Sequence, residues 1–600
     1  MHTRYLITLT LLLVCSVISP AGLEGGTELR INDKPADSPR FIEKLYIQTD
    51  RDIYISGEEL RMKIYKLNGF SGSPDNFSKV VYIELLNKQY NPVSQIKTLI
   101  DESSGSAVLN LSDTLSTGEY LICAYTRWML NFPGNRNAYR PVYIINPFRK
   151  IDYVFPEGGT LSVNSVSSSP EELKGTSEPE IHKNVKDRFN IEITTGTDHF
   201  RERENVVLDV SVTDLQGKPV KADMSVSVVR SSLVFNELSD DANVSSGKEV
   251  TSDFRESPEN MPELEGEIIT GTLRNKMTGE PFSKAGISLS FVGKKCRTQF
   301  SETDNNGRFV FIVKDQVGFG EMVIQPLSVE FNDAFIDLEQ PFSTVSDEFH
   351  FSFPAIDSIR LEGINKAIVS MQVNTIYKQL QQQHQVRSDS TAGQDFYGEA
   401  SRRITLSEYI ELKDIREVLK EIIPEVKFVR RNKQAGLKVI NANPFEVFNN
   451  MALVLIDGVP VFNIEAVLDL DASLFESIDI INTRYFFKRS VFDGIVSFVT
   501  RKGNLDVLGY ENFFFRQVYE GFKENRAFES PDYSSDSLKF SRIPDFRNTV
   551  FWNPDLSFID SGKAQVRFYS PDEKGEYTVV IEGITEDGSY GITRMPLWVY

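Results

Sequence analysis

The stretch Ala452–Val461 reads ALVLIDGVPV: a short apolar run, a two-residue turn and a brief return. The run is too short for a helix and predicts a buried strand, while Asp457 and Gly458 supply the positive φ of a hairpin turn. Upstream, apolar residues spaced by three and four predict one helical face that ends before Pro424. These residues are Leu412, Ile415, Val418, Leu419 and Ile422. Two further strands are predicted downstream, so residues 404–503 form a small α+β module.

In order and spacing, these segments resemble the plug domain of TonB-dependent outer-membrane receptors. That family shows an apolar strand into Asp-Gly-x-Pro, an Ile-x-x-Ile-x-Val strand and a final Gly-Val-Ile-x-x-x-Thr-Lys-x-Gly. Here the corresponding segments are Leu453–Pro460, Ile478–Ile481 and Gly494–Gly503. The sequence departs from the family at Tyr485–Asp493, where small residues and a Tyr-Gly turn are usual. An ordinary small α+β domain is the alternative.

A plug normally lies inside a barrel of about 22 strands, each with about 10 residues in the bilayer. Fewer than one hundred residues follow Gly503 in this sequence. The resemblance therefore implies a plug-like module outside its usual context, and transport by this chain alone is not expected.

The composition is that of a globular, multidomain protein. The chain has 600 residues, of which 40% are apolar and 25% charged, and its formal net charge is −20. This length suggests about four domains. The negative charge argues against non-specific binding to nucleic acid or anionic lipid.

The N-terminal residues predict export. A basic start, an apolar run over residues 5–18 and small residues up to Ala21 are typical of a signal peptide, here residues 1–21. Cys15 raises the question of lipid attachment, although Val14 stands where a small residue is normally required. The cysteines beyond this segment, Cys123 and Cys296, fall in different predicted domains, so no disulfide framework is expected.

The first β module is predicted over residues 41–150. Its string Thr49–Glu58, TDRDIYISGE, resembles the second macroglobulin-type (MG2-like) β-sandwich of the α2-macroglobulin family. The acids Asp50, Asp52 and Glu58 lack the alternation of a calcium loop, so we expect them to be exposed in a solvated turn. A second macroglobulin-like β module is predicted over residues 188–235, where apolar residues alternate around an Asp-Leu-Gln-Gly turn.

Residues 264–330 resemble the carboxypeptidase regulatory-like domain, a small accessory β-sandwich that carries no peptidase zinc site. The resemblance rests on Thr278–Pro281, TGEP, and on Asp304–Phe309, DNNGRF. We interpret Asp304–Gly307 as a type I′-like turn rather than a calcium loop.

The remaining segments complete the predicted order. A helix from about Gly363 has five apolar residues on one side: Ile364, Ala367, Ile368, Met371 and Ile376. The other predicted segments are a linker over 151–187, an acidic linker over 236–262, strands, helix and linker over 331–400, and a C-terminal immunoglobulin-like β domain over 504–600. The predicted fold class is mainly β: tandem immunoglobulin-like or macroglobulin-like β-sandwiches plus one small plug-like α+β module.

A search for catalytic motifs finds no nucleophile elbow, P-loop or Rossmann fingerprint. The histidines beyond the signal segment, His182, His199, His350 and His384, are isolated and lack partners at zinc-ligand spacing. The string Cys296–Gln299, CRTQ, keeps the spacing of the macroglobulin thioester but lacks its Gly and Glu. We therefore predict no enzymatic activity, no cofactor and no metal site.

Together these patterns predict a non-catalytic, exported binding or scaffold protein of a Gram-negative outer membrane or periplasm. The resemblance to plugs implies an accessory role in an outer-membrane receptor assembly, with protein partners, no nucleic acid, and membrane association through those partners rather than a transmembrane segment. The alternatives are a macroglobulin-like anti-protease without a thioester and a hydrolase with an interdomain site.

Four aromatic residues replace the small residues of the plug family and are the candidate partner-binding residues: Tyr485, Phe486, Phe487 and Phe492. They either pack on the terminal sandwich or await a partner. We favour packing, because large exposed apolar clusters are rare in soluble chains.

Overall fold

The computed structural model describes residues 42–69, 72–132, 137–149, 189–235, 259–328, 331, 333–343, 353–354, 356–382, 394–431, 434–441, 448–487, 490–509, 515–523, 526–556, 558 and 562–600. The prediction of a mainly β chain with tandem sandwiches and one α+β module is confirmed. The predicted signal peptide with Cys15, the linker over 151–187 and most of the acidic linker lie outside the described residues.

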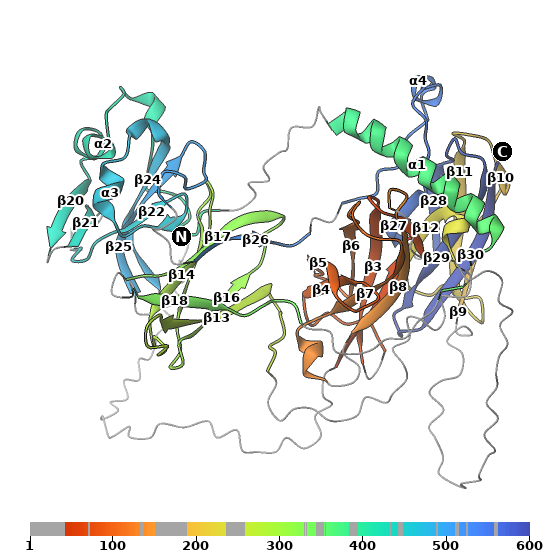
Figure 1. Cartoon of the computed structure of the whole chain (residues 1–600), viewed down its shortest axis with the longest axis horizontal. Helices are drawn as coiled ribbons and strands as arrows, with labels where there is room; N and C mark the ends of the chain where they lie inside the picture. The colour runs from red at the N-terminus through yellow and green to blue at the C-terminus, as the bar shows by residue number, and fades with distance from the viewer. Residues whose placement is uncertain are drawn as a thin grey trace, which may run out of the picture. The chain divides into compact units, whose positions relative to one another are not determined.

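The first sandwich has two sheets, with strand orders β1-β3-β6 and β2-β8-β7-β4-β5 (Figure 1). Apolar side chains from both sheets, such as Ile64 and Ile122, are fully buried between them. Every residue of β4 is buried, because one face meets this core while Tyr82 on the other face contacts Glu263 outside the sandwich. The elements are β1 (Glu43–Thr49), β2 (Ile53–Ile55), β3 (Glu59–Asn68), β4 (Val80–Leu86), β5 (Pro92–Leu99), β6 (Ser104–Asn110), β7 (Gly118–Tyr125), the 3-10 helix η1 (Trp128–Asn131) and β8 (Ala138–Ile145).

The second sandwich is built from two distant parts of the chain. Strand β12 is hydrogen-bonded to both β27 and β29, and β11 pairs with β28. The prediction of one module over 188–235 and a separate domain over 504–600 is therefore wrong, since each part buries its apolar face only against the other. The elements are β9 (Phe189–Thr195), β10 (His199–Phe200), β11 (Asn205–Asp214), β12 (Ala222–Arg230), η3 (Ser231–Leu233), α4 (Asp536–Lys539), β27 (Thr549–Leu556), β28 (Lys563–Tyr569), β29 (Gly575–Thr585) and β30 (Tyr590–Val599).

The third sandwich also takes a strand from the predicted terminal domain, because β26 extends the sheet β15-β14-β17. At the turn Asp304–Gly307 only Gly307 has a positive φ, 75°, whereas a type I′ turn needs two such residues. The side chain of Asp304 instead accepts hydrogen bonds from the amides of Asn306 and Arg308. The strands are β13 (Glu267–Asn275), β14 (Gly286–Phe291), β15 (Arg297–Glu302), β16 (Arg308–Val313), β17 (Phe319–Pro326), β18 (Ala334–Leu338) and β26 (Phe515–Glu520).

The α+β module has the sheet order β19-β24-β25-β22-β23, with β25 antiparallel to β24 and parallel to β22. Its two short helices cover this sheet, and Asp414 caps α2 by accepting a hydrogen bond from the amide of Glu417. The elements are β19 (Arg402–Thr405), η5 (Leu406–Glu408), α2 (Ile415–Glu421), β20 (Val426–Arg431), β21 (Gln434–Val439), β22 (Leu453–Ile456), β23 (Val459–Pro460), α3 (Ile464–Leu468), η6 (Ala472–Leu474), β24 (Phe475–Phe487) and β25 (Ser490–Thr500).

The long helix α1 (Ser358–Gln382) lies against β2 and η3, where Ile364, Ala367 and Met371 are buried. Ile376, predicted on the same side, is 59% exposed. The 3.6-residue period explains this, because it turns Ile376 well away from the line through Ile364 and Met371. In the described part of the chain, no helix is both long and apolar enough to cross a membrane.

Candidate functional site

The candidate partner-binding residues lie at the far end of the β24–β25 hairpin, where Tyr485 is paired with Phe492. Side chains alternate along a strand, so Tyr485 and Phe487 share one face with Phe492, and Phe486 points the other way. The ring of Phe300 on β15 lies 6.1, 5.6 and 5.7 Å from the rings of Tyr485, Phe487 and Phe492. These three aromatics therefore pack on the third sandwich, not on the terminal sandwich as expected.

The four residues separate into two kinds. Tyr485, Phe487 and Phe492 are partly buried in a cluster that also includes Phe300 and Phe396. Phe486 is 67% exposed and belongs to no such cluster. We call the five packed residues, Phe300, Phe396, Tyr485, Phe487 and Phe492, the aromatic cluster.

This separation predicts different effects of two similar substitutions. Phe487→Ser removes apolar contact from the aromatic cluster and should lower the free energy of unfolding by about 2 kcal/mol. Phe486→Ser, on the exposed face, should change it by less than about 0.5 kcal/mol. Urea unfolding of the two variants measures the difference, and equal effects would contradict the two-face arrangement.

The Asp457-Gly458 turn reverses the chain and also places a buried carboxylate. Both residues have positive φ, 46° and 80°, as the sequence predicts. The Asp457 carboxylate is fully buried and accepts hydrogen bonds from the Thr500 amide (2.7 Å), the Thr500 hydroxyl (2.6 Å) and the Leu505 amide (2.9 Å). Burial raises the pKa of Asp457, and these hydrogen bonds oppose the rise. The carboxylate thus ties the turn to the end of β25.

The same turn docks on the third sandwich. A Cβ atom added at Gly458 would lie 3.2 Å from Cα of Cys296. The Thr298 hydroxyl donates to the carbonyl of Gly458, and the Gly293 amide donates to the carbonyl of Asp457 at 3.1 Å. The turn and the aromatic cluster therefore give the α+β module two separate contacts with one neighbour.

In the Thr49–Glu58 string, Asp50 and Asp52 are buried and Glu58 is half-buried, so these acids are not exposed in a solvated turn as predicted. Asp50 and Asp52 are 2% and 3% exposed. Asp52 binds the guanidinium of Arg140 at 2.6 Å and accepts a hydrogen bond from the amide of Phe235 at 2.7 Å. Burial opposes the charged form of Arg140, but the Asp52 carboxylate, together with Glu582, Tyr46 and Tyr590, outweighs it and raises the pKa of Arg140. The partners are distant in sequence, which is why the local pattern gave no sign of burial.

Asp50 and Glu58 join the first sandwich to the second. The Thr549 hydroxyl donates to Asp50 at 2.5 Å, and the Asn548 amide group donates to Glu58 at 2.6 Å. We call Asp50, Asp52 and Glu58 the acid cluster. Its contacts reach β27, so the string that resembles a macroglobulin-type motif holds two sandwiches together here.

A second charged contact joins the first sandwich to the third. The buried ammonium of Lys97 lies 2.8 and 2.6 Å from the two carboxylate oxygens of Glu267, which also accepts a hydrogen bond from the Tyr519 hydroxyl. Beside this pair, Glu263 accepts hydrogen bonds from the Tyr82 hydroxyl (2.9 Å) and the Ile268 amide (2.8 Å). Burial raises the pKa of Glu263 to about 7, although Arg127 and these hydrogen bonds oppose the rise.

The raised pKa of Glu263 predicts that stability falls as the pH rises. The folded protein keeps a proton at Glu263 that the unfolded chain has already released, so the contribution is complete below about pH 4.5 and is lost through pH 7. Across this window the loss should reach up to about 3 kcal/mol. Urea unfolding at several pH values measures it. The variant Glu263→Gln mimics the protonated form, so its free energy of unfolding should depend less on pH. An equally steep pH dependence in that variant would show that another group causes it.

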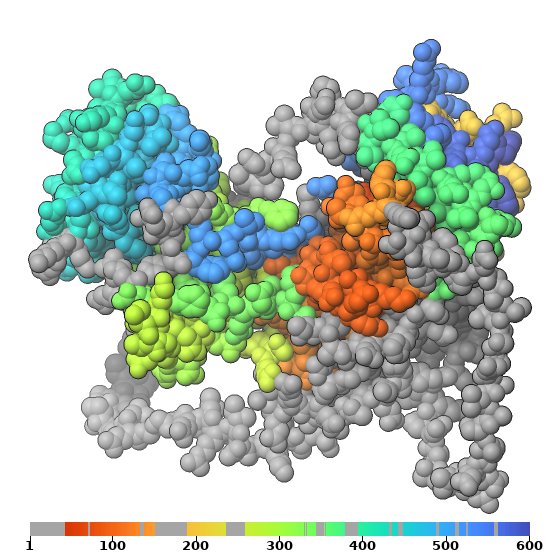
Figure 2. All heavy atoms as spheres, in the orientation of Figure 1, coloured from red at the N-terminus to blue at the C-terminus, as the bar shows by residue number. Residues whose placement is uncertain are grey.

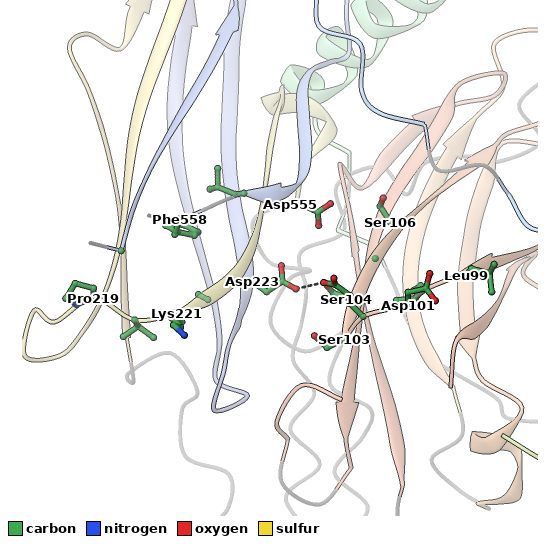
Figure 3. Close-up of a pocket in the computed structure, with 17 residues that line it drawn as sticks. Leu99, Asp101, Ser103, Ser104, Ser106, Pro219, Lys221, Asp223, Asp555 and Phe558 are labelled. Atoms are coloured by element: carbon green, nitrogen blue, oxygen red, sulfur yellow. Dashed lines mark hydrogen bonds between the residues drawn. The ribbon is translucent and has the colours of Figure 1, made fainter. Parts of the chain in front are cut away.

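A groove of about 820 Å³ separates the first and second sandwiches (Figure 3). The buried Lys63 ammonium binds Asp223, a lining residue, and donates to the Pro554 carbonyl at 2.6 Å, while the Ser104 hydroxyl donates to Asp223. The Asp223 carboxylate is thus neutralised by a protein cation. The lining includes no histidine or cysteine; it comes from residues 99–106, 219–223, 555–556, 558 and 562.

The described residues contain no group of three or more His, Cys, Asp or Glu that could hold a metal ion. His199 is exposed and stacks on Trp598 with ring centres 6.4 Å apart, beside Asp198. The other histidines considered above, His182, His350 and His384, lie outside the described residues. The described histidine thus faces water beside an aromatic ring.

The two residues of the thioester-like spacing have other partners. The thiol of Cys296 is buried 3.3 Å from the Ser497 hydroxyl, and burial raises its pKa to about 12. The side-chain amide of Gln299 pairs with the backbone of Ile312 across the edge of β16, with its nitrogen 2.7 Å from the carbonyl. Gln299 therefore satisfies an edge-strand carbonyl and amide.

These partners predict that methylamine has no target at this position. A thioester would be cleaved by methylamine and would leave a methylamide on Gln299, whereas a hydrogen-bonded amide does not react. Peptide mass spectrometry after methylamine treatment should find Gln299 unmodified and one titratable thiol at Cys296 after denaturation. A methylamide at Gln299 would overturn this assignment.

Several residues of these contacts have no signal in the sequence, among them Lys63 and Lys97. A lone charged residue in an alternating strand is most often solvent-exposed.

No protein-family model matches the chain, and no curated protein matches it. Solved structures with some likeness include Escherichia coli α2-macroglobulin in its native conformation, 10% identical with a TM-score of 0.23, and Salmonella α2-macroglobulin reacted with methylamine, 9% identical with a TM-score of 0.23. Each match covers 94% of this chain and 40% of the macroglobulin. The Escherichia coli adhesin FdeC matches at 10% identity and a TM-score of 0.13, covering 49% of this chain and 63% of the adhesin. The fold class therefore rests on this chain's own sheets.

Proposed function

We propose that this protein is a non-catalytic scaffold of the Gram-negative envelope that binds other proteins, as an accessory component of an outer-membrane receptor assembly. The proposal is supported by the position of the charged contacts between the modules of the chain. The acid cluster, the Lys97–Glu267 pair and the Lys63–Asp223 pair all lie where one module meets another. Charged groups that hold modules together preorganise a surface for binding, which lowers the entropy lost on association.

The predicted contact is Phe486. It is the candidate residue that stays exposed, and it projects from a hairpin that the aromatic cluster fixes to the third sandwich. Large aromatic side chains held on rigid elements are the usual anchors of protein interfaces. The resemblance of residues 404–503 to a plug supplies the expected partner class, an outer-membrane receptor.

Affinity capture from detergent-solubilised outer membrane tests the proposal. The tagged wild-type chain should co-purify with an outer-membrane protein, and Phe486→Ser should reduce the captured amount by about tenfold. Phe335→Ser is the matched control, because Phe335 is also exposed, at 53%, but lies on the third sandwich away from the hairpin. Capture that is equal for all three chains would contradict the role of Phe486, and an absent partner would contradict the scaffold function.

A further inference from the structure

The loop before β27 exposes three apolar side chains. It contains the short helix α4 and stands away from the strands of the second sandwich (Figures 1 and 2). Every residue from 534 to 540 is exposed. Leu538, Phe540 and Ile543 are 50%, 75% and 49% exposed. Apolar side chains in a surface loop normally pack the loop onto the protein, but these three remain in water.

Polar contacts to one buried arginine hold this loop instead. Arg203 is 8% exposed and has a positive φ of 54°. Its Nη1 donates to three loop carbonyls, and its Nη2 donates to a fourth, at 2.7–3.2 Å; these belong to Leu538, Lys539, Ser541 and Ile543. Its Nε and Nη2 also bind the Asp572 carboxylate, both at 2.6 Å. The loop is therefore fixed by an arginine fork while its apolar side chains stay free.

The charges of the loop tip differ in sign from those of the whole chain. Within Leu538–Ile543, LKFSRI, the apolar residues alternate with the basic residues Lys539 and Arg542. Both basic residues are exposed, and neither forms an ion pair with another described residue. The chain as a whole has a net charge of −20. Charges on the rest of the surface are screened beyond about 8 Å at physiological salt, so the tip presents its own positive charge to a surface that it touches.

We propose that the loop tip, residues 538–543, docks directly on a phospholipid surface that contains anionic lipid. Leu538, Phe540 and Ile543 enter the boundary between headgroups and acyl chains, and Lys539 and Arg542 contact the lipid phosphates. A projecting tip suits the soft, extended surface of a membrane, and its exposed cations complement anionic headgroups. Each basic residue beside such a surface strengthens binding by about fivefold. This contact is independent of the Phe486 surface.

Sedimentation of the full chain with vesicles tests the proposal. Vesicles of phosphatidylethanolamine with a minority of phosphatidylglycerol should carry the protein down, and pure phosphatidylcholine vesicles should carry much less. Phe540→Ser should weaken binding by about tenfold. The double variant Lys539→Glu, Arg542→Glu should weaken it more strongly, and added salt should weaken the wild type.

Matched variants away from the tip serve as controls. Phe335→Ser removes another exposed aromatic, and Lys276→Glu with Lys427→Glu makes the same charge change on other modules. All these residues are exposed, so thermal unfolding should be unchanged throughout. A wild-type chain that does not sediment with anionic vesicles would refute the proposal. Tip variants that sediment with vesicles like the wild type would also refute the proposal. The same holds if the chain captures a membrane protein without vesicles and only Phe540→Ser abolishes that capture. If Phe486→Ser loses receptor capture but still binds vesicles, the lipid contact is supported independently of the proposed receptor contact.

Discussion

Asp52→Ala is expected to lower the free energy of unfolding by about 3–5 kcal/mol, one of the two largest effects of a single substitution in this protein. The guanidinium of Arg140 is buried, and Asp52 neutralises it at 2.6 Å. Without that carboxylate the arginine keeps its charge in a poorly solvated position, and the Phe235 amide loses its acceptor. Removing one partner of a buried pair costs far more than the pair itself contributes.

Urea unfolding of the full chain measures this loss, and Asp113→Ala is the matched control. Asp113 is an exposed acid of the same sandwich, so its replacement should change stability by less than about 0.5 kcal/mol. The double variant Asp52→Ala, Arg140→Ala should be less damaging than the sum of the single variants, because the stranded charge is removed as well. Additive single effects, or a loss below about 1 kcal/mol for Asp52→Ala, would show that the two groups are not coupled.

Asp457→Ala should be destabilising to a similar degree, by about 3–5 kcal/mol. The substitution strands three buried donors at once, the amides of Thr500 and Leu505 and the hydroxyl of Thr500. Alanine is also strained at a φ of 46°, a region that aspartate and asparagine tolerate better. Because the same turn touches Gly293 and Thr298, the contact between the α+β module and the third sandwich should loosen with it.

A graded series distinguishes the hydrogen bonds from the backbone strain. Asp457→Asn keeps one acceptor oxygen and the tolerance for positive φ, so it should lose only about 1–2 kcal/mol. Asp469→Ala, which breaks an exposed ion pair with Arg416, should lose less than about 1 kcal/mol. Hydrogen exchange at Thr500 and Leu505 should accelerate in Asp457→Ala. Equal losses for alanine and asparagine would attribute the effect to something other than these three donors.

The two contacts behind the largest predicted effects differ in how far the sequence alone predicts them. The turn at Asp457 and Gly458 is a local pattern, since positive φ at two adjacent residues has few solutions and Asp-Gly is one of the favoured pairs. The hydrogen bonds to Thr500 and Leu505 are not local, because they depend on where β25 ends. The pairing of Asp52 with Arg140 spans 88 residues, and no pattern within Thr49–Glu58 implies it.

Local periodicity determined the elements of this chain: alternating strands, the helix through Ile364 and Met371, and the α+β character of residues 404–503. Period-2 alternation states which face of a strand is apolar, and it leaves open which distant strand will cover that face. The tertiary structure alone therefore decided that β12 pairs with β27 and β29 in one discontinuous sandwich. It likewise decided that Phe300 covers Tyr485 and Phe487, and that Asp50 and Asp52 are buried. Burial and charge pairing depend on residues that folding brings together. A pattern along the sequence therefore predicts the helices and strands but not which of them pack against each other.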